Sequence, residues 1–255
     1  MSAAPKTGRL VWLTGGSEGI GRAVALGLAR RGDRVMVSAR SADKLQALVA
    51  EAPEGSIIAY PLDITDRAAV AETVARIEAE QGPIDLALLN AGSHKPVSAE
   101  SFTVDDVRLL VDLNIMGTVN CMEPVIRAFR QRGRGHMAIV ASVAGYGGLP
   151  TSAAYGATKA ALINMAESLK LDFDGLGLKL QLVNPGFVRT PLTDRNDFSM
   201  PFLMEPEDAA KALIAGLDED GFEITFPKRF TYMLKFMQLL PYALYFPMIR
   251  WTTKK

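Results

Sequence analysis

The chain has 255 residues, enough for one large α/β domain, and 49% of them are hydrophobic, which is typical of a globular protein with a large core. Lys and Arg number 28 and Asp and Glu also number 28, so no excess of positive charge favours nucleic acid as a partner. The single cysteine, Cys121, excludes an internal disulfide framework and is typical of a reducing, cytoplasmic compartment.

A glycine-rich loop follows the first apolar run, residues 9–14, and leads into a helical pattern that ends near Arg31. The loop reads Gly15-Gly-Ser-Glu-Gly-Ile-Gly21, a G-x-x-x-G-x-G spacing instead of the commoner G-x-G-x-x-G. Between a strand and a helix, such glycines let the main chain approach a pyrophosphate that rests on the helix N-terminus. The sequence therefore predicts a dinucleotide site at this loop.

The end of the next strand, residues 34–39, indicates which dinucleotide is bound. Dinucleotide folds place an acid here to bind a ribose 2′-hydroxyl, whereas an arginine accommodates a 2′-phosphate. Ala39 and Arg40 stand at this point, and Lys44 follows one turn into the next helix. We predict a preference for NADP(H). The alternative is that Arg40 and Lys44 are ordinary solvated charges, and Glu18 adds a negative charge to the glycine loop.

Strand and helix patterns alternate along the rest of the chain. Helices are expected over 42–51, 66–81, 104–130, 154–174 and from residue 206, and strands over 57–60, 86–89, 137–141, 179–183 and 222–226. Pro124 interrupts the longest helical pattern and is expected to kink it. Alternation at this interval predicts an α/β fold with a doubly wound parallel sheet and helices on both faces. Residues 1–227 are expected to form one domain, followed by an apolar extension over 228–255.

The segment 142–159 carries the candidate catalytic groups. An apolar run ends at Ser142, and after a Gly/Pro-rich loop an Ala-rich helix carries Tyr155 and Lys159 on one face. An ammonium near a phenol lowers the pKa of the phenol, and a serine hydroxyl at the end of a neighbouring strand can bind a substrate oxygen. The pattern indicates a proton donor, the group that tunes it and a positioning group. The alternative is a surface tyrosine packed beneath a lysine stem.

Taken in order, these motifs resemble those of the short-chain dehydrogenase/reductase family over residues 8–226. The matching features are Thr14 with the glycine loop, Asp63, Asn90-Ala-Gly92, the set Asn114, Ser142, Tyr155 and Lys159, and Pro185-Gly186 with Thr190. Leu89 departs from the family pattern, in which another Asn is common. The resemblance implies a Rossmann-type sheet of seven strands and hydride transfer between NADP(H) and a carbonyl or alcohol.

The resemblance also implies roles for the four catalytic candidates. Tyr155 would be the general acid that protonates the carbonyl oxygen, and Lys159 would lower the pKa of Tyr155 and bind the nicotinamide ribose. Ser142 would bind the substrate oxygen. Asn114, whose role comes from the resemblance alone, would orient a water molecule and the main chain for a proton relay.

The residues expected to bind the cofactor come from the glycine loop, the Arg40 region and the motifs of the resemblance. They are Gly15, Ser17, Glu18, Gly19, Ile20, Gly21, Arg40, Lys44, Asp63, Asn90, Ala91, Gly92, Tyr155, Lys159, Pro185, Gly186, Val188 and Thr190. By resemblance, Asp63 lies beside the adenine, and the segment from Pro185 to Thr190 lies near the nicotinamide. No metal is expected, because the two histidines, His94 and His136, are far apart in the sequence without a cluster of ligands.

The loop from Phe187 to Glu205 is long for a compact domain, and loops of this length often act as lids. Its apolar residues, together with Tyr146 and Leu149 of the preceding loop, favour an apolar substrate, and ordinary packing is the alternative. The glycine loop with Arg40 and Lys44 resembles that of 3-ketosphinganine reductases, which also carry a hydrophobic tail. A long-chain ketone is therefore the favoured substrate, and 3-oxoacyl, steroid and polyol substrates are alternatives.

The C-terminal tail is the least usual part of the sequence. Residues 236–249 carry no charge and are flanked by basic residues, namely Lys228, Arg229, Lys235, Arg250, Lys254 and Lys255. Fourteen residues interrupted by Pro241 and Pro247 are too few for a transmembrane helix, whereas aromatic, apolar and basic residues together suit an interfacial membrane contact. A cover over the substrate site and an oligomer interface are the alternatives.

Two classes of function fit these observations. The first is an NADPH-dependent carbonyl reductase or alcohol dehydrogenase, favoured because the catalytic set is intact. The second is a regulator or scaffold that binds NADP without turnover, since a fold does not imply a function. By resemblance we expect a homodimer or homotetramer that pairs through the helices at 104–130 and 154–174. The segment from Met1 to Arg9 has no apolar region, so no signal peptide is expected.

Overall fold

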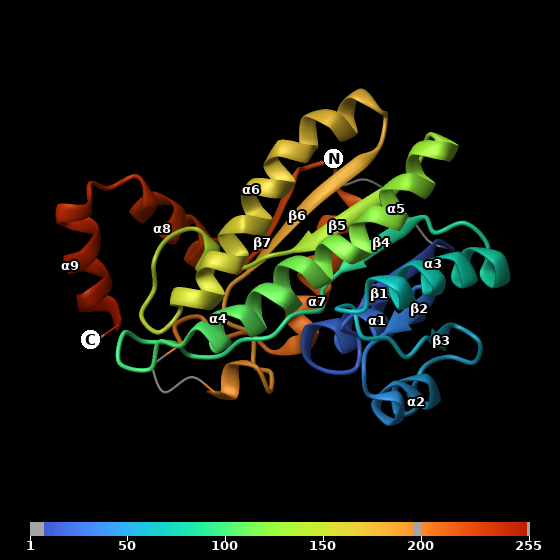
Figure 1. Cartoon of the computed structure of the whole chain (residues 1–255), viewed down its shortest axis with the longest axis horizontal. Coiled ribbons are helices and arrows are strands. Elements are labelled where there is room, and N and C mark those ends of the chain that lie inside the picture. Colours follow the sequence, from blue (N-terminus) through green and yellow to red (C-terminus); the bar gives the residue numbers. More distant parts are fainter. Residues whose placement is uncertain (1–7, 196–199, 254–255) are drawn as a thin grey trace.

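The structure is a computed structural model that describes residues 8–195 and 200–253. Parts of three expectations lie outside these residues: the chain start, the middle of the 187–205 loop and the last two lysines of the tail. Seven parallel strands form one sheet in the order β3-β2-β1-β4-β5-β6-β7 (Figure 1). They are β1 (Leu10–Thr14), β2 (Arg34–Ser38), β3 (Ile57–Ala59), β4 (Leu86–Leu89), β5 (His136–Val140), β6 (Lys179–Pro185) and β7 (Glu223–Phe226). The predicted α/β fold of the Rossmann type is confirmed.

The register of the strands brings the sequence motifs to one edge of the sheet. Thr14 at the end of β1 pairs with Ser38 of β2 and with Leu89 of β4, and Leu89 pairs with Ile139 of β5. The strand order reverses between β1 and β4, and in sheets of this kind ligands bind in the crevice beyond the carboxyl ends at that point. The loops that follow β1, β2, β4 and β5 therefore surround one crevice.

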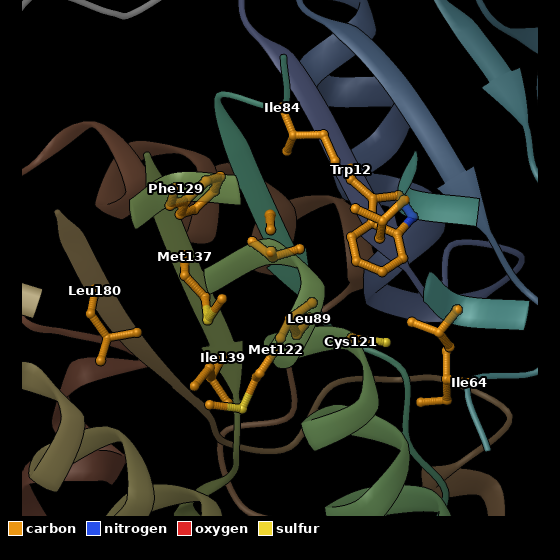
Figure 2. Close-up of a cluster of buried hydrophobic side chains, with 14 of the residues drawn as sticks. Trp12, Ile64, Ile84, Leu89, Cys121, Met122, Phe129, Met137, Ile139 and Leu180 are labelled. Carbon is orange, nitrogen blue, oxygen red and sulfur yellow. The ribbon is translucent and has the colours of Figure 1, made fainter. Parts of the chain in front are cut away.

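Helices cover both faces of the sheet and bury two separate hydrophobic clusters. One face carries α1 (Gly19–Arg30), α2 (Ala42–Glu51) and α7 (Pro206–Asp218), and the other carries α3 (Arg67–Gln81), α5 (Thr118–Arg132) and α6 (Ala153–Gly175). Figure 2 shows the second cluster, where Met122 and Phe129 of α5 pack onto Met137 and Ile139 of β5. The sequences of the central strands are continuously apolar because both faces of these strands are buried.

The longest predicted helix differs from its expectation at one point. It begins with α4 (Val104–Leu110), continues through a π-helical turn (Val111–Gly117) and ends with α5. The departure from α-helical geometry lies at Val111–Gly117, and Pro124 sits inside α5, where the expected kink stays a prediction. Thr118 Oγ1 donates a hydrogen bond of 2.8 Å to the carbonyl oxygen of Asn114 in the π-helical turn. A side-chain hydroxyl therefore serves as a partner for a main-chain carbonyl where the helix departs from α geometry.

Val104–Arg132 is also the one helix among the described residues whose length and apolar composition would suffice to cross a membrane. Its Met122, Val125 and Phe129 side chains are buried in the core cluster of Figure 2. The helix is thus accounted for as the central helix of one sheet face.

The tail forms two further helices, α8 (Lys228–Gln238) and α9 (Tyr242–Thr253), at one end of the molecule (Figure 1). Phe230 and Leu234 of α8 and Tyr245 of α9 pack in a third hydrophobic cluster with Tyr146 of the loop after β5. Tyr245 also donates a hydrogen bond of 2.9 Å to the carbonyl oxygen of Gly148. The tail therefore rests on the loop that follows Ser142, and β7 ends one residue before the domain boundary expected at 227.

Candidate active site

The catalytic candidates of the segment 142–159 meet beyond the carboxyl end of β5. Ser142 follows β5, and its Oγ accepts a 3.1 Å hydrogen bond from the Ala144 N–H, which fixes the hydroxyl against the start of the loop. Tyr155 and Lys159 lie one turn apart on α6, with the Lys159 Nζ atom 5.7 Å from the centre of the Tyr155 ring. Lys159 is buried, and its Nζ donates a hydrogen bond of 3.0 Å to the Val140 carbonyl oxygen.

Burial dominates the ionisation of Tyr155 and Lys159. It raises the pKa of the Tyr155 phenol, and a hydrogen bond with Ser142 opposes that shift. Burial also lowers the pKa of Lys159 to about 8. In the chain alone, burial therefore outweighs the lowering of the Tyr155 pKa expected from Lys159, whose ammonium is itself desolvated and donates its hydrogen bond to Val140. A phenol that keeps its proton is the form a general acid needs for reduction.

Asn114 lies in the π-helical turn and is fully buried beside this group. Its Oδ1 accepts a 2.8 Å hydrogen bond from the Ser93 N–H, and its Nδ2 donates to the Ser93 carbonyl oxygen at 2.9 Å and to Thr158 Oγ1 at 3.1 Å. The amide thus joins the loop after β4 to α6, between Tyr155 and Lys159. What the structure shows for Asn114 is the positioning of main chain, and the expected water relay stays a prediction.

A cleft of about 310 Å³ opens beyond the ends of β1, β2 and β4. Thirteen of the residues expected to bind the cofactor line it, namely Gly15, Ser17, Glu18, Gly19, Ile20, Gly21, Arg40, Lys44, Asp63, Asn90, Ala91, Gly92 and Thr190. The remaining five, Tyr155, Lys159, Pro185, Gly186 and Val188, line an adjoining cavity of about 110 Å³ that shares Asn90, Gly92 and Thr190 with the cleft. The structure therefore brings all of the predicted cofactor residues to two adjoining hollows, while their contacts with a cofactor stay a prediction.

Close packing of main chain explains why the glycine loop needs its glycines. Gly15 has φ +70°, and a Cβ there would lie 2.6 Å from the Ala91 Cα. The Asn90 Nδ2 group donates hydrogen bonds to the carbonyl oxygens of Thr14 and Gly15 at 3.2 and 3.0 Å, and Thr14 Oγ1 accepts from the Asn90 N–H at 3.1 Å. The glycine loop and the Asn90 loop are thus fastened together as one wall of the cleft.

The basic residues at the far end of the cleft behave differently from each other. Lys44 forms an ion pair of 2.6 Å with Glu18 at the cleft wall. The negative charge of Glu18 is therefore directed at Lys44. Arg40 is exposed, and its charge contributes to the lowered pKa of Asp63, after the hydrogen bonds that Asp63 accepts from Thr65. Arg40 is therefore the better placed of the two cations for an anionic group in the cleft.

A third cavity of about 80 Å³ is also lined by Ser142 and Tyr155. Its wall includes Leu149 and Phe187, two of the apolar residues expected on the substrate side, and His94, for which no role in the site was expected. The His94 ring lies edge-on to the Tyr155 ring, with 4.8 Å between centroids. No pattern signalled His94, because only the path of the loop after Gly92 brings it to α6.

Comparison with known proteins agrees with this arrangement. A family model described as short chain dehydrogenase matches residues 9–199. The chain belongs to the short-chain dehydrogenase family. It is 38% identical over 239 residues to an uncharacterized oxidoreductase of Myxococcus xanthus, covering 93% of this chain and 94% of that one, and 32% identical over 212 residues to one of Staphylococcus haemolyticus, covering 83% and 92%.

Solved structures of this family share the fold. A short-chain dehydrogenase from Streptomyces avermitilis superposes with a TM-score of 0.83 at 25% identity, covering 96% of this chain and 97% of that one. ElxO with NADP bound superposes with a TM-score of 0.77 at 28% identity, covering 86% and 98%. Membership of the family makes this protein an oxidoreductase that uses a nicotinamide cofactor.

Proposed function

We propose that the protein is an NADPH-dependent carbonyl reductase, or alcohol dehydrogenase in the reverse direction, with Tyr155 as its general acid. One observation carries the proposal: Ser142 and Tyr155 belong to the wall shared by two cavities, one that also shares residues with the cofactor cleft and one lined by Leu149 and Phe187. A carbonyl group that enters from the substrate side meets a hydroxyl and a phenol at that wall. The same wall faces the cofactor side.

The groups of the wall divide the reaction between them. A bound nicotinamide supplies the hydride, and the chain supplies the proton and the orientation. Ser142 Oγ donates a hydrogen bond to the substrate oxygen, and the Tyr155 phenol, kept protonated by burial, donates its proton to that oxygen as charge develops on it. The Lys159 ammonium stabilises the phenolate that remains. Asn114 acts through Ser93 by fixing the loop opposite Tyr155.

The preference for NADP(H) is the second part of the proposal. Supporting it, the end of β2 offers Ala39 and Arg40 to the cleft in place of an acid, and ElxO is a solved relative with NADP bound. Replacing Arg40 by Ala is expected to weaken NADPH binding at least about ten-fold and leave NADH binding unchanged, because only the 2′-phosphate loses a partner. Arg30→Ala, on the exposed side of α1, is the control. An unchanged NADPH to NADH ratio in the Arg40 variant would contradict the phosphate assignment.

An apolar, lipid-like substrate is the third part. The substrate-side cavity is lined by Val143, Ala144, Leu149 and Phe187 beside the polar groups of the wall, which favours a ketone attached to an apolar chain. The resemblance to 3-ketosphinganine reductases stays a prediction that neither the family match nor the relatives test. NADPH absorbance with a panel of long-chain ketones, 3-oxoacyl thioesters, steroids and polyols decides among these classes.

The alternative of a regulator without turnover is decided by the same panel. A protein that binds NADPH and reduces no member of the panel would favour the regulator, whereas reduction that depends on Tyr155 supports the enzyme. The expected homodimer or homotetramer also stays a prediction. Leu109 of α4 and Leu171 of α6 are exposed on the helices expected to pair, and sedimentation velocity of the wild type tests the assembly.

A further inference from the structure

The exposed face of α8 and α9 is unlike the rest of the surface. Nine large apolar side chains of this pair are more than a third exposed, namely Tyr232, Met233, Phe236, Leu239, Tyr242, Leu244, Phe246, Met248 and Trp251. In α9 only Tyr245 and Ile249, four residues apart, are buried among the residues 242–251. A surface helix ordinarily turns polar residues to water on its outer side, but here the outer side is apolar as well.

Charge in this part of the chain is one-sided. Residues 228–255 contain six of the 28 basic residues and none of the 28 acidic residues, so the tail carries a charge of +6 and residues 1–227 carry −6. Lys228 and Arg229 begin α8 and Arg250 lies in the last turn of α9, whereas Lys235 is paired with Glu223. An apolar, aromatic face bordered by cations matches the acyl chains and anionic headgroups of a lipid surface.

We infer that the α8–α9 face docks on the surface of an anionic bilayer. A second copy of the chain fits the same face less well, because in a two-fold interface each patch meets itself and the cations that border the face would meet their own copies. Tyr and Trp are suited to the boundary between headgroups and acyl chains, since their rings are apolar with a polar edge. Tyr232, Tyr242 and Trp251, all more than half exposed, occupy such positions on the face.

Docking at this face would bring the substrate side of the active site to the lipid. An open groove of about 430 Å³ runs between α9 and the loop after β5, lined by Gly148, Leu149, Pro150, Phe246, Ile249 and Arg250. Leu149 belongs both to this groove and to the substrate-side cavity. The groove, which reaches Phe246 of the exposed face, therefore adjoins the substrate-side cavity at Leu149.

Tryptophan fluorescence of the full chain measures the docking directly. The sequence has two tryptophans; Trp12 is fully buried in β1, and Trp251 is 82% exposed, so a change on adding vesicles reports on Trp251. We expect a blue shift of the emission with vesicles of phosphatidylcholine and phosphatidylglycerol in equal parts, and none with phosphatidylcholine alone. The shift is expected to weaken at high salt because the cations act through screened charge. An emission unchanged by either vesicle would overturn the inference.

Matched variants separate the face from the rest of the protein. Vesicle co-sedimentation is expected to be lost in Leu239→Ser/Tyr242→Ser, whose side chains are 81% and 76% exposed, and kept in Leu171→Ser, which is 78% exposed on α6. Arg229→Gln/Arg250→Gln is expected to lower vesicle affinity about five-fold for each cation removed. Equal co-sedimentation of all these variants would contradict docking at this face. A wild-type dimer that becomes monomeric only in the Leu239→Ser/Tyr242→Ser variant would also contradict it. Because no readout involves turnover, the docking and the proposed reaction can fail separately.

Discussion

The carboxyl edge of the central strands and the C-terminal end of the molecule are built in opposite ways. At the edge, Thr14, Asn114 and Lys159 are buried polar groups, and each has a hydrogen bond with main chain. At the C-terminal end, α8 and α9 pack on Tyr146 through apolar side chains and leave a large apolar face exposed. The first arrangement holds the candidate catalytic groups in place, whereas the second leaves the apolar surface on which the proposed docking depends.

The largest effect is expected at the edge, from Asn114→Ala. The change leaves the half-buried N–H and carbonyl oxygen of Ser93 without their partner, and an unsatisfied buried group costs about 1–3 kcal/mol. We predict that the free energy of unfolding falls by about 3 kcal/mol in urea denaturation. Asn164→Ala, at an exposed position of α6, is expected to change it by less than about 0.5 kcal/mol. A loss as small as that of the control would mean that the edge is less tightly determined than described.

Glu223 is the corresponding polar group of the C-terminal end. Its carboxylate accepts hydrogen bonds from Tyr146 at 2.5 Å and Asn184 at 2.7 Å and pairs with Lys235 of α8. Burial alone would raise the pKa of Glu223, but the bonds from Lys235, Tyr146 and Asn184 lower it overall. A carboxylate whose folded pKa is lowered stabilises fully above its unfolded pKa and loses that stabilisation as pH falls through the folded value.

Glu223→Gln is therefore expected to lower the free energy of unfolding by about 2 kcal/mol at neutral pH, because charge-assisted bonds are lost. The difference from wild type should disappear in acid, below the ordinary carboxyl range. Denaturation curves at a series of pH values measure it, with the exposed Glu72→Gln of α3 as the control. A difference that does not vary with pH would show that the charge of Glu223 does not hold α8 to the sheet.

Lys159 gives the edge a pH dependence of its own. Burial lowers its pKa to about 8, so the ammonium is charged below that pH and neutral above it. The rate of reduction is expected to fall roughly ten-fold per pH unit above about pH 8, since the neutral amine no longer stabilises the Tyr155 phenolate. In Lys159→Arg the profile should stay flat there, whatever its absolute rate, because a guanidinium keeps its charge. Identical profiles for the two proteins would remove Lys159 as the source of the inflection.

The smallest effect is expected where the two regions meet, at Leu149→Ala. Shortening this side chain removes apolar contact for a long chain but leaves Ser142 and Tyr155 untouched. We predict that kcat/KM falls about five-fold for a long-chain ketone and hardly at all for a short one, the range that a few methylene groups allow. Leu171→Ala is the matched control. An equal loss for both ketones would place Leu149 in the catalytic geometry instead of the substrate path.

The sequence predicted the carboxyl edge of the central strands far better than the C-terminal end of the molecule. Alternating strands and helices gave the sheet, and the glycine loop, Ser142, Tyr155 and Lys159 were recognisable because each depends on local spacing next to a strand end. The π-helical turn at Asn114, the contact of His94 with Tyr155 and the ion pair between Glu18 and Lys44 depend on packing between distant elements. No local pattern encodes such contacts.

The composition of the tail was recognisable in the sequence, but its structure was not. Its lack of charge over 236–249 was visible, whereas the division into α8 and α9 and the packing of Tyr245 on Gly148 were not. Pro241 and Pro247 argued against a transmembrane helix, and the structure places the first before α9 and the second inside it. The docking partner of a tail depends on which side chains remain exposed after folding, and a sequence does not give that directly.

The most direct test of the central claim is the Tyr155→Phe variant with a carbonyl substrate found in the panel. Removing one hydroxyl should leave NADPH binding and the free energy of unfolding near their wild-type values and lower kcat for reduction by at least about 100-fold, because the proton donor is gone. NADPH binding by fluorescence and its consumption by absorbance give both quantities on the same preparation. Reduction at a rate near that of wild type would contradict the assignment of Tyr155 as the general acid.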